Sequence, residues 1–197
     1  MEEIRERIIN LLGTTTREGM TALVDWLNST DFFKAPASTK YHNNHEGGLA
    51  KHSLAVYDIL KAKNDIYKKL DDETIIITAL LHDVCKINFY VKEKRNVKEG
   101  TKINEWGREV ANWVEKEVYT VKDLKPLGHG EKSVIAIQEL MPLTKVEQAM
   151  IRWHMLFTEP KEFYRTINNA LDKYPEIILL HTADLEATYL VDKRSEN

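Results

Sequence analysis

The sequence predicts a mostly α-helical protein with a small β-hairpin inserted among its helices. Apolar residues recur at spacings of three and four along most of the chain, which is the periodicity of amphipathic helices. Residues 87–121 are instead rich in aromatic and β-branched side chains, which favour strands. The 197 residues are enough to bury a substantial core, so we expect a single domain over residues 1–197.

The first 40 residues are expected to form a helical segment followed by a loop. Residues 2–12 and 19–28 each carry an apolar stripe at helical spacing, whose members are Ile4, Ile8, Leu11 and Leu12, then Met20, Leu23, Val24 and Leu27. The loop runs from Ser29 to Gly48. Its Gly47-Gly48 pair fits either a tight turn that starts a helix or backbone amides that approach a phosphate.

The next two helices bring ionisable side chains toward the interior. In the helix expected over 49–63, His52 shares a face with Leu49, Val56 and Leu60. The helix that follows Asp71-Asp72 has His82 on an apolar face and ends in "LLHDVCK", with Asp83 on the neighbouring face. Burying such groups costs several kcal/mol unless they are paired or bind a metal ion.

Residues 87–121 are predicted to form a β-hairpin, although "REVANWVEKEV" also fits a helix. This insert is either a lid or homo-oligomer contact that shapes specificity, or a structural flap. Four aromatic residues of the insert are expected to be exposed, which favours a contact surface: Phe89, Tyr90, Trp106 and Trp113. Neighbouring lysines would suit single-stranded nucleic acid, but interspersed glutamates weaken that interpretation.

The C-terminal part is predicted to contain four more helices, over 131–140, 144–155, 162–173 and 175–190. His154 and Asp184 lie on apolar stripes of two of them. One buried histidine is usually satisfied by a hydrogen bond. When several helices each direct a histidine or an aspartate inward, a shared divalent cation explains all of them together.

The composition is that of an ordinary soluble globular protein, with 43% hydrophobic and 30% charged residues. The formal charge is −3, so attraction to nucleic acid would need a local basic patch. No apolar run approaches the about 18 residues of a membrane span, and no secretory signal follows Met1, so we expect a cytoplasmic protein with no membrane partner. Cys85 is the only cysteine, and a small buried residue is a better interpretation of it than a catalytic thiol.

The order His52, His82-Asp83, Asp184 resembles the H…HD…D signature of the HD superfamily of metal-dependent phosphohydrolases. Five blocks are similar in order to those of single-domain bacterial and phage HD proteins and to the HD module of some bacterial 3'-5' exoribonucleases: "HNNHEGGLAKHSLAVYDIL", "LLHDVCK", "GHGEKS", "RWHM" and "HTADLEATYL". The resemblance spans about residues 41 to 190, with the hairpin as a variable insert.

This resemblance implies a helical HD-domain bundle in which one metal ion is held by His52, His82, Asp83 and Asp184. In many relatives, histidines that correspond to His129 and His154 bind a second ion, and the carboxylate at Asp83 bridges the two. Dinuclear relatives often have another histidine where this chain has Met155, and a thioether is a poor ligand for these ions. The sequence therefore leaves open whether one ion or two ions bind. A second site would need His181 or water to complete it. The ligands suit Mn, Fe, Ni, Co or Zn.

The resemblance also implies hydrolysis of a nucleotide, cyclic nucleotide or short oligonucleotide by metal-activated water. Asp83 would hold the metal and orient the water, and Lys86 would neutralise a phosphate oxygen unless it is a solvated helix-end lysine. Four further residues are substrate-binding candidates weighed against ordinary surface roles: His42, His45, Lys132 and Arg152. Two alternative functions are a nucleotide sensor or decoy without turnover, and a di-iron oxygenase, which Met155 disfavours.

Overall fold

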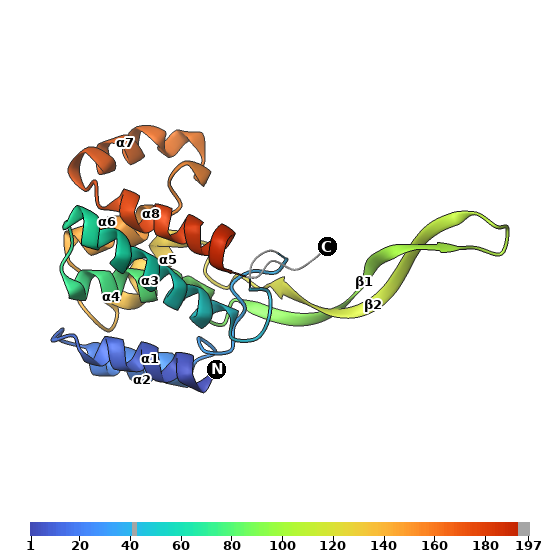
Figure 1. Ribbon diagram of the computed structural model, residues 1–197, viewed down its shortest axis with the longest axis horizontal. Coiled ribbons are helices and arrows are strands. Elements are labelled where there is room, and N and C mark those ends of the chain that lie inside the picture. The colour runs from blue at the N-terminus through green and yellow to red at the C-terminus, as the bar shows by residue number, and fades with distance from the viewer. Residues whose placement is uncertain (41–42, 193–197) are drawn as a thin grey trace.

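The computed structural model describes residues 1–40 and 43–192 as a helical body with a long two-stranded arm (Figure 1). This architecture confirms the prediction of a mostly α-helical protein with a β-hairpin insertion. The helices of the body are α1 (Glu2–Gly13), α2 (Met20–Ser29), α3 (Gly48–Tyr67), α4 (Asp72–Leu81), α5 (His129–Gln138), α6 (Lys145–Trp153), α7 (Tyr164–Lys173) and α8 (Ile177–Glu186). None of the described helices combines the length and the apolar character that crossing a bilayer requires.

Helix α4 is the buried centre of the body. After its first turn the sequence is almost wholly apolar, and every residue from Thr74 to Leu81 is buried. The side chain of Asp71 starts the helix by accepting a hydrogen bond from the backbone N–H of Thr74 at 2.7 Å. Because α4 contacts α1, α3 and α6 and ends at His82, it carries this imidazole into the interior.

The other helices pack around α4 on two sides. The pair α1 and α2 lies on one side of α3 and α4, and α8 and α7 lie on the other (Figure 1). Helix α3 contacts both α4 and α8, so it connects the two sides. The largest fully buried side chains include Phe32, Leu49, Leu60, Ile77 and Leu81. Burial of these apolar groups supplies the main stabilisation of the body.

The arm consists of β1 (Tyr90–Ile103) and β2 (Glu109–Val121), which pair antiparallel and project away from the helices (Figure 1). Tyr90 pairs with Val121 at the root, and the register shifts between Lys98 and Thr101. The segment "REVANWVEKEV" is therefore a strand, since pairing with β1 decides between its two local tendencies. Trp106 and Trp113 are exposed as predicted, whereas Phe89 and Tyr90 are half-buried at the root.

The helix boundaries differ from the predicted ones by a few residues, and two differences affect histidines. Helix α6 ends at Trp153, so His154 is its C-cap and does not lie within the helix. Helix α5 already begins at His129. The expected last helix divides into α8 and a π turn over Ala187–Val191. Both histidines therefore sit at helix ends, where their side chains reach toward the end of α4.

Gly48 lies where the preceding loop passes close to the start of α3. A Cβ atom on Gly48 would lie 1.9 Å from the carbonyl oxygen of Asn43 and 3.0 Å from the backbone nitrogen of Ala37. Gly47 has a φ of 78°, a left-handed conformation that favours glycine. This crowding supports the interpretation of the glycine pair as a tight turn that starts a helix.

We expect Gly48→Ala to lower the free energy of unfolding by about 1–3 kcal/mol, because the loop backbone must move to admit a methyl group. Urea denaturation of both proteins measures the difference. Gly13→Ala is the matched control, since a Cβ atom there meets nothing within 4 Å and Gly13 lies in α1. Equal losses in the two variants would show that the loop does not constrain Gly48.

Candidate metal centre

Four side chains from three helices meet at the end of α4. His52 comes from α3, Asp184 comes from α8, and His82 and Asp83 follow the last residue of α4. His52 Nε2 lies 3.0 Å from Asp184 Oδ1, and His82 Nε2 lies 3.5 Å from Asp83 Oδ2. Two donor atoms that each bind one ion at about 2.1 Å lie roughly 3.0 Å apart in an octahedral arrangement and roughly 3.4 Å apart in a tetrahedral one. The cluster therefore has the dimensions of a shared coordination sphere.

The backbone fixes the proton position on two of the buried imidazoles. His82 Nδ1–H donates to the carbonyl oxygen of Ala79 at 2.9 Å, and His154 Nδ1–H donates to that of Ile151 at 2.7 Å. Each Nε2 atom then carries a lone pair. Among the described residues, neither Nε2 atom has a hydrogen-bond partner, although both side chains are buried. Such unsatisfied acceptors are unfavourable alone, and a metal ion would satisfy both.

His52 is oriented by a carboxylate that the sequence did not single out. Its Nδ1 atom lies 2.7 Å from Asp192 Oδ2, which follows the π turn. Burial lowers the pKa of His52, but hydrogen bonds to Asp184 and Asp192 outweigh it and raise the pKa to about 9. Asp192 thus positions His52 Nε2 toward Asp184. No periodicity around Asp192 could have indicated this contact.

Asp83 connects two clusters. The first consists of His52, His82, Asp83 and Asp184, and the second consists of Asp83, His129 and His154. The Oδ1 atom of Asp83 lies 2.6 Å from His129 Nε2 and 3.7 Å from His154 Nε2, while Oδ2 faces His82. Burial raises the pKa of Asp83, but nearby Lys86, His82 and His129 hold it well below its usual range. The ionised carboxylate therefore presents one oxygen to each group of histidines.

Lys86 lies beside the same carboxylate, with Nζ 2.6 Å from Asp83 Oδ2. Burial lowers the pKa of Lys86, but the attraction of Asp83 raises it above its ordinary value, so the ammonium is charged. Both residues line a cavity of about 380 Å³. Other side chains that line it are Tyr90, His129, His154, His181, Asp184 and Tyr189. The cavity therefore gives a ligand access to the cluster and to a cation.

The comparisons agree with this geometry. The sequence profile of the family described as HD domain matches residues 49–184, which include the four residues of the first cluster. The chain belongs to the HD domain family. This finding confirms the resemblance drawn from the sequence blocks.

A curated protein that this HD domain resembles is the dihydroneopterin 2',3'-cyclic phosphate phosphodiesterase of Methanocaldococcus jannaschii. The two are 31% identical over 98 residues, which cover 47% of this chain and 38% of that protein. The match therefore spans well under half of the relative's length. No solved structure matches the chain.

Tyr90 lines the cavity of the HD domain. The sequence alone assigns this residue only to the insert. Its hydroxyl lies 3.4 Å from the carbonyl oxygen of Ala37, to which it donates. Burial raises the pKa of Tyr90 to about 12, so the hydroxyl keeps its proton. The root of the arm thus contributes a donor to the cavity, a contact that depends on tertiary structure alone.

The structure describes three of the four candidate substrate-binding residues, and none of these three lines the cavity beside Asp83. Lys132 pairs with Asp123 at 2.8 Å, and Arg152 pairs with Glu131 and Glu159. The exposed His45 lies 3.3 Å from the side-chain oxygen of Asn43. His42 lies outside the described residues. A part for these four residues in substrate binding stays a prediction.

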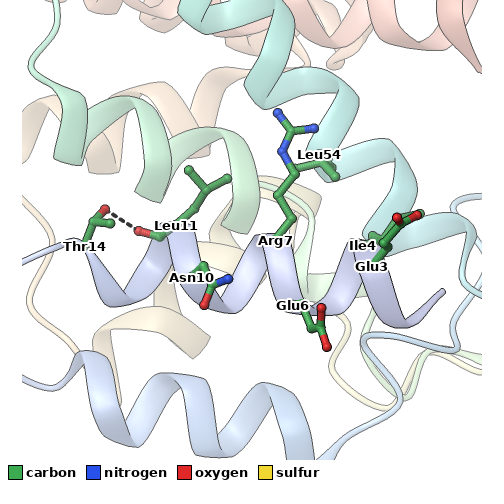
Figure 2. A pocket seen from close by; sticks show the side chains of 8 residues that line it. All are labelled: Glu3, Ile4, Glu6, Arg7, Asn10, Leu11, Thr14 and Leu54. Carbon is green, nitrogen blue, oxygen red and sulfur yellow. Dashed lines mark hydrogen bonds between the residues drawn. The ribbon is translucent and has the colours of Figure 1, made fainter.

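A larger hollow of about 590 Å³ lies along α1 and is separate from the candidate centre of the HD domain (Figure 2). Arg7 reaches from α1 toward α3, where it pairs with Asp58 at 3.0 Å, and Leu54 lies next to it. None of its lining residues belongs to the two clusters. Size alone therefore does not mark the functional site.

Without metal, we expect the HD domain to lose stability as the pH rises from about 6.5 to about 10. Burial lowers the pKa of His129, but Asp83 and Cys85 raise it to about 10, and that of His52 is about 9. A raised folded-state pKa stabilises the protein below the unfolded value of about 6.5, and this contribution disappears as the pH rises through the folded value.

Urea denaturation of chelator-treated protein across this pH range measures the effect. His129→Gln should flatten the upper part of the profile, because Gln keeps a polar side chain without titrating. A free energy of unfolding that stays constant or increases over the same range would contradict the raised pKa values of His52 and His129.

Proposed function

We propose that this protein is a metal-dependent phosphohydrolase whose substrate is a nucleotide, a cyclic nucleotide or a short oligonucleotide. The observation that carries the proposal is the group of His52, His82 and Asp184, with Asp83 Oδ2 3.9 Å from His52 Nε2. Buried imidazole nitrogens of this group lie beside a cavity that a lysine lines. Membership of the HD domain family and the phosphodiesterase relative support it at the level of the enzyme class.

The donor set fits a divalent transition metal such as Mn, Fe, Ni, Co or Zn, because it combines imidazole nitrogens with carboxylate oxygens. When bound, such an ion supplies a water activated near neutral pH and polarises a phosphoryl oxygen. His52, His82, Asp83 and Asp184 would hold one ion, and Asp83, His129 and His154 would reach a second. Asp83 would also orient the attacking water through a carboxylate oxygen.

The charged residues of the cavity suit a phosphate ester. In the structure, the Lys86 ammonium neutralises Asp83, and a bound phosphoryl group would offer it a second anionic partner. The Tyr90 hydroxyl would turn its proton from the Ala37 carbonyl to a phosphoryl oxygen, or would accept a hydrogen bond from a sugar hydroxyl. Tyr189 at the cavity offers an aromatic face of the kind on which a base stacks. A volume of about 380 Å³ is within the range of small-molecule sites.

The relative's name indicates which substrates deserve the first place in a screen. It states a 2',3'-cyclic phosphate, so cyclic nucleotides and terminal cyclic phosphates of short oligonucleotides are the first candidates. Hydrolysis adds water across one of the two P–O ester bonds of a cyclic diester and leaves a monoester on the same sugar.

The test is a substrate screen with chelator-treated protein reloaded with each of the five metals. Nucleoside monophosphates, 2',3'- and 3',5'-cyclic nucleotides and short oligonucleotides are incubated with it, and products are identified by mass spectrometry. We expect hydrolysis with at least one pair of metal and substrate, and none with His82→Ala. Tight binding in calorimetry without products would support the sensor, and iron-dependent oxygen consumption would support the oxygenase.

A further inference from the structure

Cys85 lies next to the second cluster, and nothing in the proposed reaction uses it. Its Sγ atom is 3.3 Å from His129 Nδ1 and 3.7 Å from His129 Nε2. Donor atoms of Asp83, Cys85 and His129 all lie within 4.8 Å of one another. These three residues therefore form a group with the dimensions of a metal site, apart from His52 and Asp184.

The local structure holds the thiol in this position. Cys85 lies in the short 3-10 turn Val84–Lys86, directly after Asp83, so both side chains leave one turn. The backbone N–H of Cys85 donates to the hydroxyl of Ser133 at 3.2 Å. Ser133 is one turn after His129 in α5, and this bond fixes the turn against that helix. The sulfur and the imidazole are thus positioned by the same contact.

A fourth donor borders the carboxylate of this group, and it forms a group of its own with His82 and Asp83. His154 is buried, and its Nε2 atom has no hydrogen-bond partner among the described residues. It lies 3.7 Å from Asp83 Oδ1, the oxygen that also contacts His129. Around a tetrahedral zinc ion with bonds of about 2.0–2.3 Å, donor atoms lie roughly 3.3–3.6 Å apart. The separations of 3.7 Å from His129 Nε2 to Cys85 and from Asp83 to His154 are close to these values.

We propose that the Cys85 thiolate is a ligand of a second metal ion, together with Asp83 Oδ1 and His129 Nε2. His154 Nε2, 3.7 Å from Asp83 Oδ1, is the neighbouring donor that would complete the set. This inference deepens the proposed function and rests on it, because Asp83 would be shared with the first ion. Binding releases two protons to solvent, one from the Cys85 thiol and one from His129 Nε2, and leaves a thiolate and a neutral imidazole as ligands. The sulfur ligand compensates for Met155, whose thioether is a poor ligand for these ions.

A thiolate changes the metal preference of this position. Sulfur ligands favour zinc and iron over manganese, whereas the first cluster offers only nitrogen and oxygen. The charges of Asp83 and Cys85 also balance a divalent ion better than a single carboxylate does. We therefore infer a centre with two unlike positions, of which the second selects a softer metal.

Cobalt titration of chelator-treated protein tests this inference without any substrate. Co²⁺ bound by a thiolate gives a charge-transfer band in the near ultraviolet, which oxygen and nitrogen ligands do not give. We expect this band in the unaltered protein and its loss in Cys85→Ser, with binding of the second ion at least 10-fold weaker. Met155→Leu should keep the band, which separates the thiolate from the thioether.

X-ray absorption of the zinc-loaded protein gives an independent measurement, with one sulfur expected at about 2.3 Å from zinc. Circular dichroism verifies that Cys85→Ser is folded. If the protein binds metal with neither the band nor the sulfur, the Cys85 inference is wrong while the phosphohydrolase proposal stands. If it binds no metal at all, both proposals are wrong.

Discussion

Asp83→Asn is expected to reduce hydrolysis by at least about 10³-fold, equivalent to roughly 4 kcal/mol of transition-state stabilisation. The amide keeps the size of the side chain but removes the charge that faces both groups of histidines. One oxygen contacts His129 and the other faces His82 and Lys86, so a single change weakens every ion position. Steady-state rates with the best substrate from the screen, together with metal content, measure the loss.

The variant also leaves the buried Lys86 ammonium without its carboxylate. Breaking a buried ion pair costs about 3–5 kcal/mol, so part of the loss could reflect unfolding. Asp83→Asn combined with Lys86→Met removes the unpaired charge and should restore the fold without restoring activity. Asp65→Asn is the matched control, because Asp65 is an exposed residue of α3. Activity that survives in the folded double variant would rule out Asp83 as a ligand.

Metal loading should raise the melting temperature of chelator-treated protein by about 5–10 °C. An ion at 100 times its dissociation constant stabilises a folded protein by about 2.7 kcal/mol, and for a chain of this size each kcal/mol raises the midpoint by about 2–4 °C. The stabilisation arises because the ion satisfies the buried Nε2 atoms of His82 and His154, for which residues 1–40 and 43–192 provide no hydrogen-bond partner. Calorimetric scans with and without zinc or manganese measure the shift.

Magnesium and calcium should have little effect at the same concentration, since both prefer oxygen ligands. Asp83→Asn should lose most of the shift with zinc, whereas Asp65→Asn should keep it. An equal shift in both variants would show that the ions bind elsewhere, for example at exposed carboxylates.

The parts of the site that the sequence predicted are those tied to local periodicity. His52 shares a helix face with core residues, and His82 ends an apolar run, so helical spacing alone directs both inward. The same reasoning applied to "REVANWVEKEV" left two outcomes, because Val110, Val114 and Val118 fit helical and strand spacing equally. Only the pairing with β1 decided between them.

The parts that could not be predicted depend on contacts between distant segments. Asp192 reaches His52 across 140 positions of the chain, and Tyr90 reaches the cavity from the root of the arm. Arg152 was a candidate for an anionic substrate because the sequence does not show that Glu131 and Glu159 neutralise it. A charged residue's partner depends on the fold, whereas its tendency to face inward is visible in the sequence.

The pairing of Tyr90 with Val121 means that the chain leaves the helical body and returns to it at neighbouring points. For the helices, the whole arm is equivalent to a short connection, and the entropy of closing such a connection depends only slowly on its length. Beyond its root pair, the arm is thus free to be shortened, lengthened or exchanged through evolution without altering the residues that line the cavity. The length of the arm can therefore vary independently of the residues of the candidate metal centre.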